Sequence, residues 1–175
     1  GWGHMHEKER AVADLYAAAD RFLRTVRVGP TQWQSAASGG WSPSQITEHV
    51  AISCDNIARL LCGPLAANPI ERGATGVLDV EIPYLFYRGD EPPNVATPTG
   101  TWTDPDEATR RLTASVDAIV TWARDTSLDL RTVGVRHPVF GVLDGMQWLL
   151  FAAAHVERHR AQAIGVQTRP DYPHG

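Results

Sequence analysis

The sequence is poor in cysteine, in long apolar runs and in clustered positive charge. Its only two cysteines among 175 residues are Cys54 and Cys62. They lie eight positions apart on one expected helix, about 12 Å along its axis, which is too far for a disulfide. We therefore expect both to be reduced residues of the core. A nucleophilic role for either is disfavoured, because the local sequence offers no neighbouring base.

No apolar run approaches the roughly 18 residues that are needed to cross a bilayer. The N-terminus also lacks the order of charged and then apolar residues that is typical of a signal peptide. We therefore predict a cytoplasmic protein with no membrane partner. The formal net charge is −4 and no long basic run is present, which argues against nucleic acid as a partner, because that binding depends on clustered Lys and Arg. A metal ion and a small-molecule substrate remain open as partners, and so does a homodimer.

Length and composition fit a single compact domain. With 175 residues, of which 43% are hydrophobic and 21% are charged, the chain can bury a full core. The opening Gly1–His4 resembles an expression-tag scar that ends before Met5. We therefore predict one domain over residues 5–175 and exclude residues 1–4 from it. The sequence shows no internal repeat and no low-complexity tract.

Four segments have the three-and-four spacing of apolar residues that is typical of amphipathic helices. The first is predicted over about Glu7–Val26, and Gly29-Pro30 ends it. The second begins at Ser42 as N-cap, with Gln45 closing a capping box, and ends near Cys62. A proline at its first helical position strengthens that prediction.

The other two predicted helices lie in the second half of the chain. The third has Asp104 as N-cap, Glu107 as partner in a capping box, and an apolar stripe up to about Arg124. The fourth opens at Asp144 with Gln147 three residues later. Its first half is apolar almost all round, so we expect it to be the most buried helix.

A connection of about forty residues, Gly63–Thr103, separates the second and third helices and contains six prolines. A connection of this length inside a compact domain is typical of a functional lid or of disorder. Its segment Val77–Tyr87 is too apolar and aromatic for disorder, so we expect it to pack on the body as a short helix broken at Pro83. We find no alternating pattern typical of a strand. The sequence therefore predicts an all-α four-helix bundle.

Three histidines lie on helix faces where they could bind a metal ion. Counting 100° per residue, His49 lies at the edge of the buried face of the second helix. His155 and His159 are four apart on the fourth helix and share a face, as two ligands of one metal ion would. A single histidine of this kind is more often a hydrogen-bonded core residue, and the pair alone is weak evidence. Glu157 lies two residues after the first histidine, so the metalloprotease motif H-E-x-x-H is absent.

Two stretches together carry a resemblance. "WSPSQITEHV" (residues 41–50) follows a long first helix, and "HPVFGVLDGMQWLLFAAAHVERHRAQ" (residues 137–162) lies near the C-terminus. In order and spacing they resemble the DinB-like, or YfiT-like, family of four-helix proteins over most of the chain. The resemblance implies a divalent metal ion bound by His49, His155 and His159. Three imidazoles suit Zn, Ni or Fe(II) better than Ca or Mg, and they leave positions for water or substrate.

The resemblance leaves two classes of function open. Some relatives in the family are transferases that use a low-molecular-weight thiol (bacillithiol, mycothiol or glutathione), and others are metal-dependent hydrolases or isomerases. We therefore expect an enzyme in which the metal activates a thiol or water. The alternative is a non-enzymatic metal-binding or ligand-binding stress-response protein. The Ala-rich and Arg-rich composition points to a high-GC bacterium, where mycothiol is the natural thiol. No catalytic residue is assigned.

Further residues are candidates for the surroundings of this site. Glu48, Asp55 and Glu157 are candidates for hydrogen bonds to the histidine rings, although an exposed helix charge is the favoured interpretation for each. His137 lies on the loop before the fourth helix, where a turn residue is favoured over a pocket residue. The last candidates are aromatic side chains that either line a substrate pocket or, as is favoured, pack in the core. They are Trp41, Tyr84, Phe86, Tyr87 and Trp148.

Overall fold

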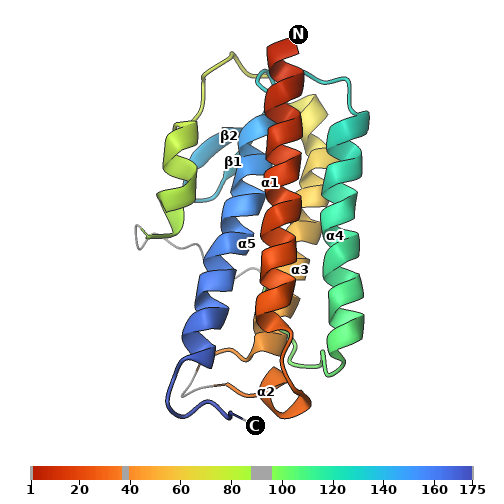
Figure 1. Cartoon of the computed structure of the whole chain (residues 1–175). Helices are drawn as coiled ribbons and strands as arrows, with labels where there is room; N and C mark the ends of the chain where they lie inside the picture. The colour runs from red at the N-terminus through yellow and green to blue at the C-terminus, as the bar shows by residue number, and fades with distance from the viewer. Residues whose placement is uncertain (1, 37–39, 88–95, 175) are drawn as a thin grey trace.

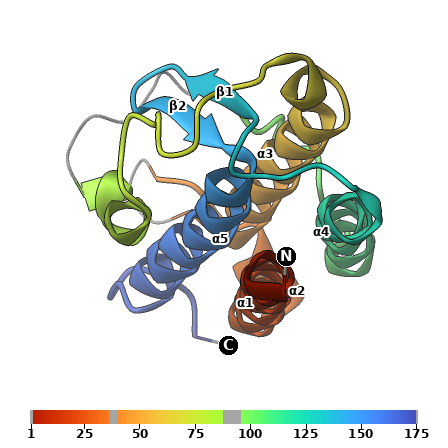
Figure 2. The same ribbon diagram turned by 90° about the horizontal axis from the view of Figure 1, so that it is seen from above.

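Four long helices form the predicted all-α bundle, as Figure 1 shows. The computed structural model describes residues 2–36, 40–87 and 96–174, apart from the side chain of Tyr87. Its elements are, in chain order, α1 (Trp2–Val26), α2 (Pro30–Trp33), α3 (Pro43–Cys62), the 3-10 helices η1 (Pro64–Ala67) and η2 (Asp79–Tyr87), α4 (Pro105–Asp125), β1 (Gly134–His137), β2 (Gly141–Asp144) and α5 (Gly145–Gln167). Seen from above in Figure 2, α1 lies beside α5, and α3 lies between α5 and α4.

The apolar stripes of the four helices meet in one core. The predicted stripe of α4 is buried from Leu112 to Ala123, and each fully buried large side chain stabilises the fold by about 1.5–3 kcal/mol relative to exposure. The expectation that the last helix is the most buried is wrong. In α3, 12 of 20 residues are buried, compared with 11 of 23 in α5. One face of α5 carries charged side chains that border a surface groove, whereas α3 packs against both α4 and α5.

Two capping boxes fix the starts of the helices that carry the three histidines. At α3, the amide of Gln45 donates to the Ser42 hydroxyl over 3.1 Å, and the Gln45 side chain accepts from the Ser42 amide over 3.0 Å. At α5, Asp144 and Gln147 exchange the same pair of bonds over 2.7 and 3.1 Å. Both predictions are confirmed. The register of each histidine is therefore set by hydrogen bonds about one to four turns upstream.

The predicted capping box of α4 is wrong. Asp104 is the N-cap, but its side chain accepts from the amide of Asp106. Glu107 instead pairs with Arg110 and Arg111 on the exposed surface. Two arginines three and four residues along the helix compete for this carboxylate, so it does not turn back to the cap.

The first predicted helix agrees with the structure at its end but not at its start. α1 ends at Val26 as predicted, but it begins at Trp2, so residues 2–6 extend the helix upstream of Glu7.

Of the two cysteines, Cys54 is buried, as expected, and burial raises the pKa of its thiol to about 12. Cys62 is exposed in the last turn of α3, so its assignment to the core is wrong. Both cysteines are free.

A short antiparallel hairpin, β1 with β2, lies at the start of α5, and the sequence analysis missed it. Each strand has four residues, which is too short for an alternating pattern to be recognised. The Gly63–Thr103 connection pairs alongside it, because the amide of Gly76 donates to the carbonyl of Val142 over 2.9 Å. A Cβ at Gly76 would lie 2.2 Å from the Phe140 carbonyl oxygen, so only glycine permits this approach.

The Val77–Tyr87 segment packs on the body of the bundle, as predicted. It forms η2, drawn in yellow-green beside α5 in Figure 1, and Ile82 and Leu85 are fully buried. The predicted break at Pro83 is wrong, because the 3-10 helix continues through it. The part of the connection from 88 to 95 lies outside the described residues.

One half-buried cation joins three elements near the start of α5. Arg131 pairs with Asp79 of η2 over 2.6 Å and with Asp144, the N-cap of α5, over 3.1 Å. It also pairs with Glu7 of α1. These carboxylates hold the pKa of Arg131 well above its ordinary value, although burial opposes them. The same guanidinium lowers the pKa of Asp79.

The segment Pro43–Ala67 is long and apolar enough, by length and mean hydropathy, to cross a membrane. The sequence analysis, which considers uninterrupted apolar runs, does not single it out. Inside the bundle, α3 packs its apolar side chains against α4 and α5. A core position accounts for the same hydropathy, so the segment is weak evidence for a membrane span.

Candidate metal centre

The histidine cluster consists of His49 from α3 and His155 and His159 from α5. The Nε2 atom of His49 lies 3.3 Å from that of His155 and 3.0 Å from that of His159, and the two α5 atoms are 3.1 Å apart. His49 and His155 are each only 8% exposed. The structure therefore brings together the three residues that the resemblance singles out, and they could hold one metal ion.

Hydrogen bonds donated by Nδ1 orient two of the three rings. His49 Nδ1 lies 2.9 Å from the carbonyl oxygen of Ala96. Because a carbonyl oxygen only accepts, the proton is on Nδ1 and the lone pair is on Nε2. His159 Nδ1 lies 2.7 Å from Gln162 Oε1, which assigns the same tautomer. His155 Nδ1 is buried and has no hydrogen-bond partner in the part of the chain that the structure describes.

This arrangement fits a transition metal ion. With both Nδ1 atoms donating, the Nε2 atoms of His49 and His159 face each other as lone pairs across 3.0 Å, which is repulsive unless a cation lies between them. Metal–nitrogen bonds of about 2.0–2.1 Å separate two ligand nitrogens by about 3.3 Å at tetrahedral angles and about 3.0 Å at right angles. The observed separations of 3.0–3.3 Å span both values. The donor set is that expected for Zn, Ni or Fe(II).

Burial keeps the two α5 histidines neutral. It lowers the pKa of His155 well below the ordinary value, and the neighbouring His159 and His49 lower it further. Burial and His49 lower the pKa of His159 to about 3, although the bond to Gln162 opposes the shift. A metal must compete with protons for imidazole lone pairs. At neutral pH these two rings would therefore not have to lose a proton before they bind a cation.

Aromatic rings surround the cluster, and the sequence analysis identified some of them. The Trp41 ring centroid lies 5.0 Å from that of His49, and the Phe86 centroid lies 5.5 Å from that of His155. Phe151, which the analysis missed, is stacked with His155 at 6.1 Å. Its position one turn before His155 on an apolar helix is a signal that could have found it.

Of the other three aromatic candidates, the structure describes the side chains of Trp148 and Tyr84, and neither lines the cluster. Trp148 is buried and packs against Phe151 and His137, so its core interpretation is confirmed. Tyr84 is 68% exposed on η2. The side chain of Tyr87 lies outside the described residues.

The acidic candidates are placed in three different settings. Glu48 is buried, so the favoured interpretation of an exposed charge is wrong for it. Asp55 is exposed. Glu157 lies on the opposite side of α5 and pairs with Arg21 over 2.6 Å. The sequence analysis missed two partners of the histidine rings. The Ala96 carbonyl has no sequence signal, whereas the i+3 spacing of Gln162 from His159 was a signal that could have identified it.

His137 has the turn role that the sequence favoured. Its Nδ1 accepts hydrogen bonds from the amides of Val139 and Phe140 over 3.1 and 3.3 Å. The ring also stacks on Phe140. Burial lowers the pKa of His137 to about 4, which keeps the accepting lone pair available at neutral pH.

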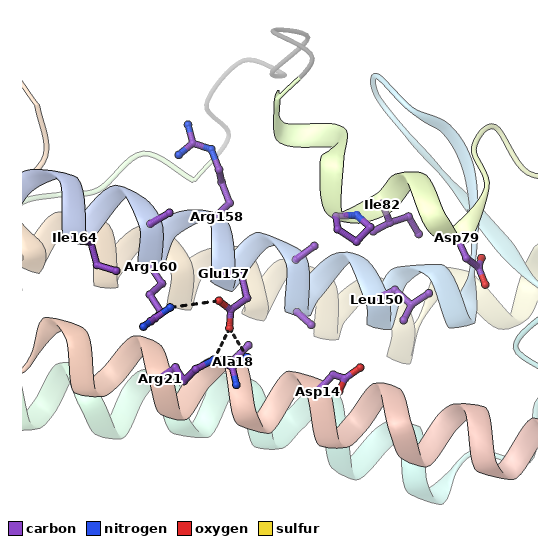
Figure 3. A pocket seen from close by; sticks show the side chains of 14 residues that line it. Asp14, Ala18, Arg21, Asp79, Ile82, Leu150, Glu157, Arg158, Arg160 and Ile164 are labelled. Carbon is purple, nitrogen blue, oxygen red and sulfur yellow. Dashed lines mark hydrogen bonds and ion pairs between the residues drawn. The ribbon is translucent and has the colours of Figure 1, made fainter.

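A surface groove of about 470 Å³ lies on the other face of α5 from the histidine cluster. Figure 3 shows it between α1 and η2, with Glu157 pointing toward Arg21 and Arg160. None of the three clustered histidines lines it. The groove and the histidine cluster thus lie on separate faces of α5. We assign the candidate site to the histidine cluster.

Comparison with known proteins supports the family resemblance. The sequence model of the DinB superfamily matches residues 9–163. That range includes His49, His155 and His159. Comparisons with curated proteins and with solved structures gave no match.

Proposed function

The chain belongs to the DinB superfamily, and from this membership we propose that it binds one divalent transition metal ion through His49, His155 and His159. The observation that carries the proposal is the convergence of three Nε2 atoms within 3.3 Å of one another. Zn, Ni and Fe(II) are the ions that suit three neutral imidazoles.

We further propose that the site is enzymatic and acts on a small-molecule substrate with a low-molecular-weight thiol or water as the nucleophile. A divalent ion held by three protein ligands supplies positive charge that lowers the pKa of a thiol or of water. Ala96 and Gln162 fix the tautomers of His49 and His159, so that each presents its Nε2 lone pair. Phe86 and Phe151 cover His155 and limit the access of bulk water. The Ala-rich and Arg-rich composition favours mycothiol as the thiol.

Metal content of the purified protein tests the binding proposal. In the wild type and in every variant of this experiment, His4 and His6 are first replaced by alanine, so that metal bound near the N-terminus is not counted with metal bound at the cluster. We expect about one Zn or Ni per chain by elemental analysis after dialysis against a weak chelator. A His155→Ala/His159→Ala double variant should lose the metal, whereas His174→Ala should retain it. Equal metal content in the double variant would overturn the proposal.

The electronic spectrum of the Co(II)-substituted protein tests the use of a thiol. Mycothiol, bacillithiol and glutathione are added in turn at equal concentration. A new sulfur-to-cobalt charge-transfer band with mycothiol, absent from the double histidine variant, is the expected result. A spectrum that does not change with any of the three thiols would reject thiol activation. If the protein also fails to react with electrophilic and hydrolysable substrates, the non-enzymatic alternative would be favoured.

A further inference from the structure

Glu48 is a buried carboxylate whose two oxygens are bound by main-chain amides. Its side chain is part of α3, directly before His49, and the residue is only 1% exposed. Oε2 accepts from the amide of Thr99 over 2.6 Å, and Oε1 accepts from the amide of Gly100 over 3.1 Å. A buried carboxylate is costly unless hydrogen bonds replace its hydration. Here the replacement comes from the end of the Gly63–Thr103 connection.

The segment that Glu48 holds also carries the partner of His49. The carbonyl oxygen of Ala96, which lies three residues before Thr99, accepts the hydrogen bond from His49 Nδ1 over 2.9 Å. Ala96 is itself buried. Pro98, between Ala96 and Thr99, has a fixed φ, which reduces the conformational freedom of this short segment. The position of the Ala96 carbonyl therefore depends on where Thr99 and Gly100 are anchored.

The Ala96 carbonyl in turn determines how His49 meets a metal. A hydrogen bond from the distal ring nitrogen sets the tautomer and the orientation of a metal-binding histidine. We infer that Glu48 is a positioning residue, which holds residues 96–100 so that Ala96 keeps His49 with its proton on Nδ1 and its lone pair on Nε2. This inference rests on the proposed metal function for its consequence, but the contact chain exists without a metal.

The isosteric substitution Glu48→Gln should break this chain of contacts. A glutamine amide has nearly the same volume, but its NH2 group cannot accept from either backbone amide, so one of the two anchors is lost. Ser44→Ala is the matched control. Ser44 is equally buried on α3, and its hydroxyl donates to the carbonyl of Trp102 over 2.6 Å, so it also ties the connection to α3 but further from Ala96.

Two measurements separate positioning from general stabilisation. Side-chain 1H–15N correlation spectra of the metal-free proteins report the tautomer of each histidine. We expect a single Nδ1–H tautomer for His49 in the wild type and in Ser44→Ala, and a mixture in Glu48→Gln. Zinc affinity, measured by competition with a coloured chelator, should fall on the order of tenfold in Glu48→Gln and less than about twofold in Ser44→Ala.

The outcomes are distinguishable. An unchanged His49 tautomer in Glu48→Gln overturns the inference, and so do equal losses of affinity in both variants, because these indicate a merely structural role. If the wild type binds no zinc at the cluster, the proposed function fails while the tautomer spectra still decide the role of Glu48. Should Glu48→Gln fail to fold, Glu48→Asp keeps the charge and shortens the reach, and a smaller change in the same direction is expected.

Discussion

The two faces of α5 differ in the environment of their polar side chains. One face presents His155 and His159 as neutral rings against α3, with their pKa values lowered by burial. The other face presents Glu157 to solvent, paired with Arg21 over 2.6 Å, beside the groove in Figure 3. The buried face brings imidazole nitrogens within 3.3 Å of one another, whereas the exposed face neutralises its charges in pairs. The convergence of these nitrogens, rather than the volume of the groove, identifies the candidate site.

The largest expected effect separates the two faces by metal binding. His49→Ala should weaken zinc affinity by at least about tenfold, because it removes one of the three imidazoles. The metal-free fold should survive, because the same change removes the repulsion between the facing Nε2 lone pairs of His49 and His159. Glu157→Ala, on the exposed face of α5, should change the affinity less than about twofold. Chelator competition measures both. Similar zinc affinities in the two variants would contradict the assignment of metal binding to the histidine face. A large loss of metal-free stability in His49→Ala would instead identify His49 as a core residue.

Acid should destabilise the metal-free protein through the buried face. The pKa of His159 is about 3 in the folded protein and near 6.5 in an unfolded chain. Between these values the unfolded state binds more protons, so stability is full above pH 6.5 and is lost as the pH falls toward 3. His159→Gln should flatten the change in unfolding free energy between pH 7 and pH 4 by on the order of 1–3 kcal/mol.

Urea unfolding at several pH values measures this slope. Arg160→Gln on the exposed face is the control, because an arginine stays charged throughout this range and its removal leaves the slope in place. A wild-type protein equally stable at pH 7 and pH 4 would contradict the burial of a neutral His159.

The cap of α3 should have a smaller effect on stability. Ser42→Ala removes the acceptor of the Gln45 amide and should cost about 0.5–2 kcal/mol of unfolding free energy. Ser53→Ala, in the middle of the same helix, should be close to neutral. Thermal and urea unfolding compare the two variants. If they unfold alike, the cap does not set the start of the helix that positions His49 opposite α5.

The smallest effect is expected on the exposed face itself. Arg21→Ala breaks the pair with Glu157, whose side chains are 49% and 36% exposed, and should cost at most about 1 kcal/mol because solvent screens exposed ion pairs. The cost should vanish in 1 M salt. Unfolding at low and high salt measures it. A loss above 2 kcal/mol that persists in salt would show that this face is as tightly coupled as the histidine face.

Local signals explain what the sequence could predict. Ser42 with Gln45 and Asp144 with Gln147 are contacts within one turn, so their spacing alone identifies them. The 100° count placed His49 at the edge of a buried face, where it is 8% exposed. That the three histidines converge came from the family resemblance, because no local pattern states which helices are neighbours.

Contacts distant in sequence explain what could not be predicted. The Ala96 carbonyl meets His49 across 47 residues, and a backbone group has no sequence signature. Glu48 looked like an ordinary helix charge because its partners, Thr99 and Gly100, lie in a connection without a recognisable pattern. Glu107 had the right spacing for a capping box, but two nearby arginines offered it a closer interaction.

The Arg131 ion pairs have a consequence for the order in which the chain folds. Arg131 reaches Asp144 across 13 residues, Asp79 across 52 and Glu7 across 124. Contacts at such separations must wait until the loss of chain entropy has been offset elsewhere. Asp79 and Glu7 can therefore meet Arg131 only after η2 and α1 have docked. We expect the complete network to form late in folding and to couple the first and last helices.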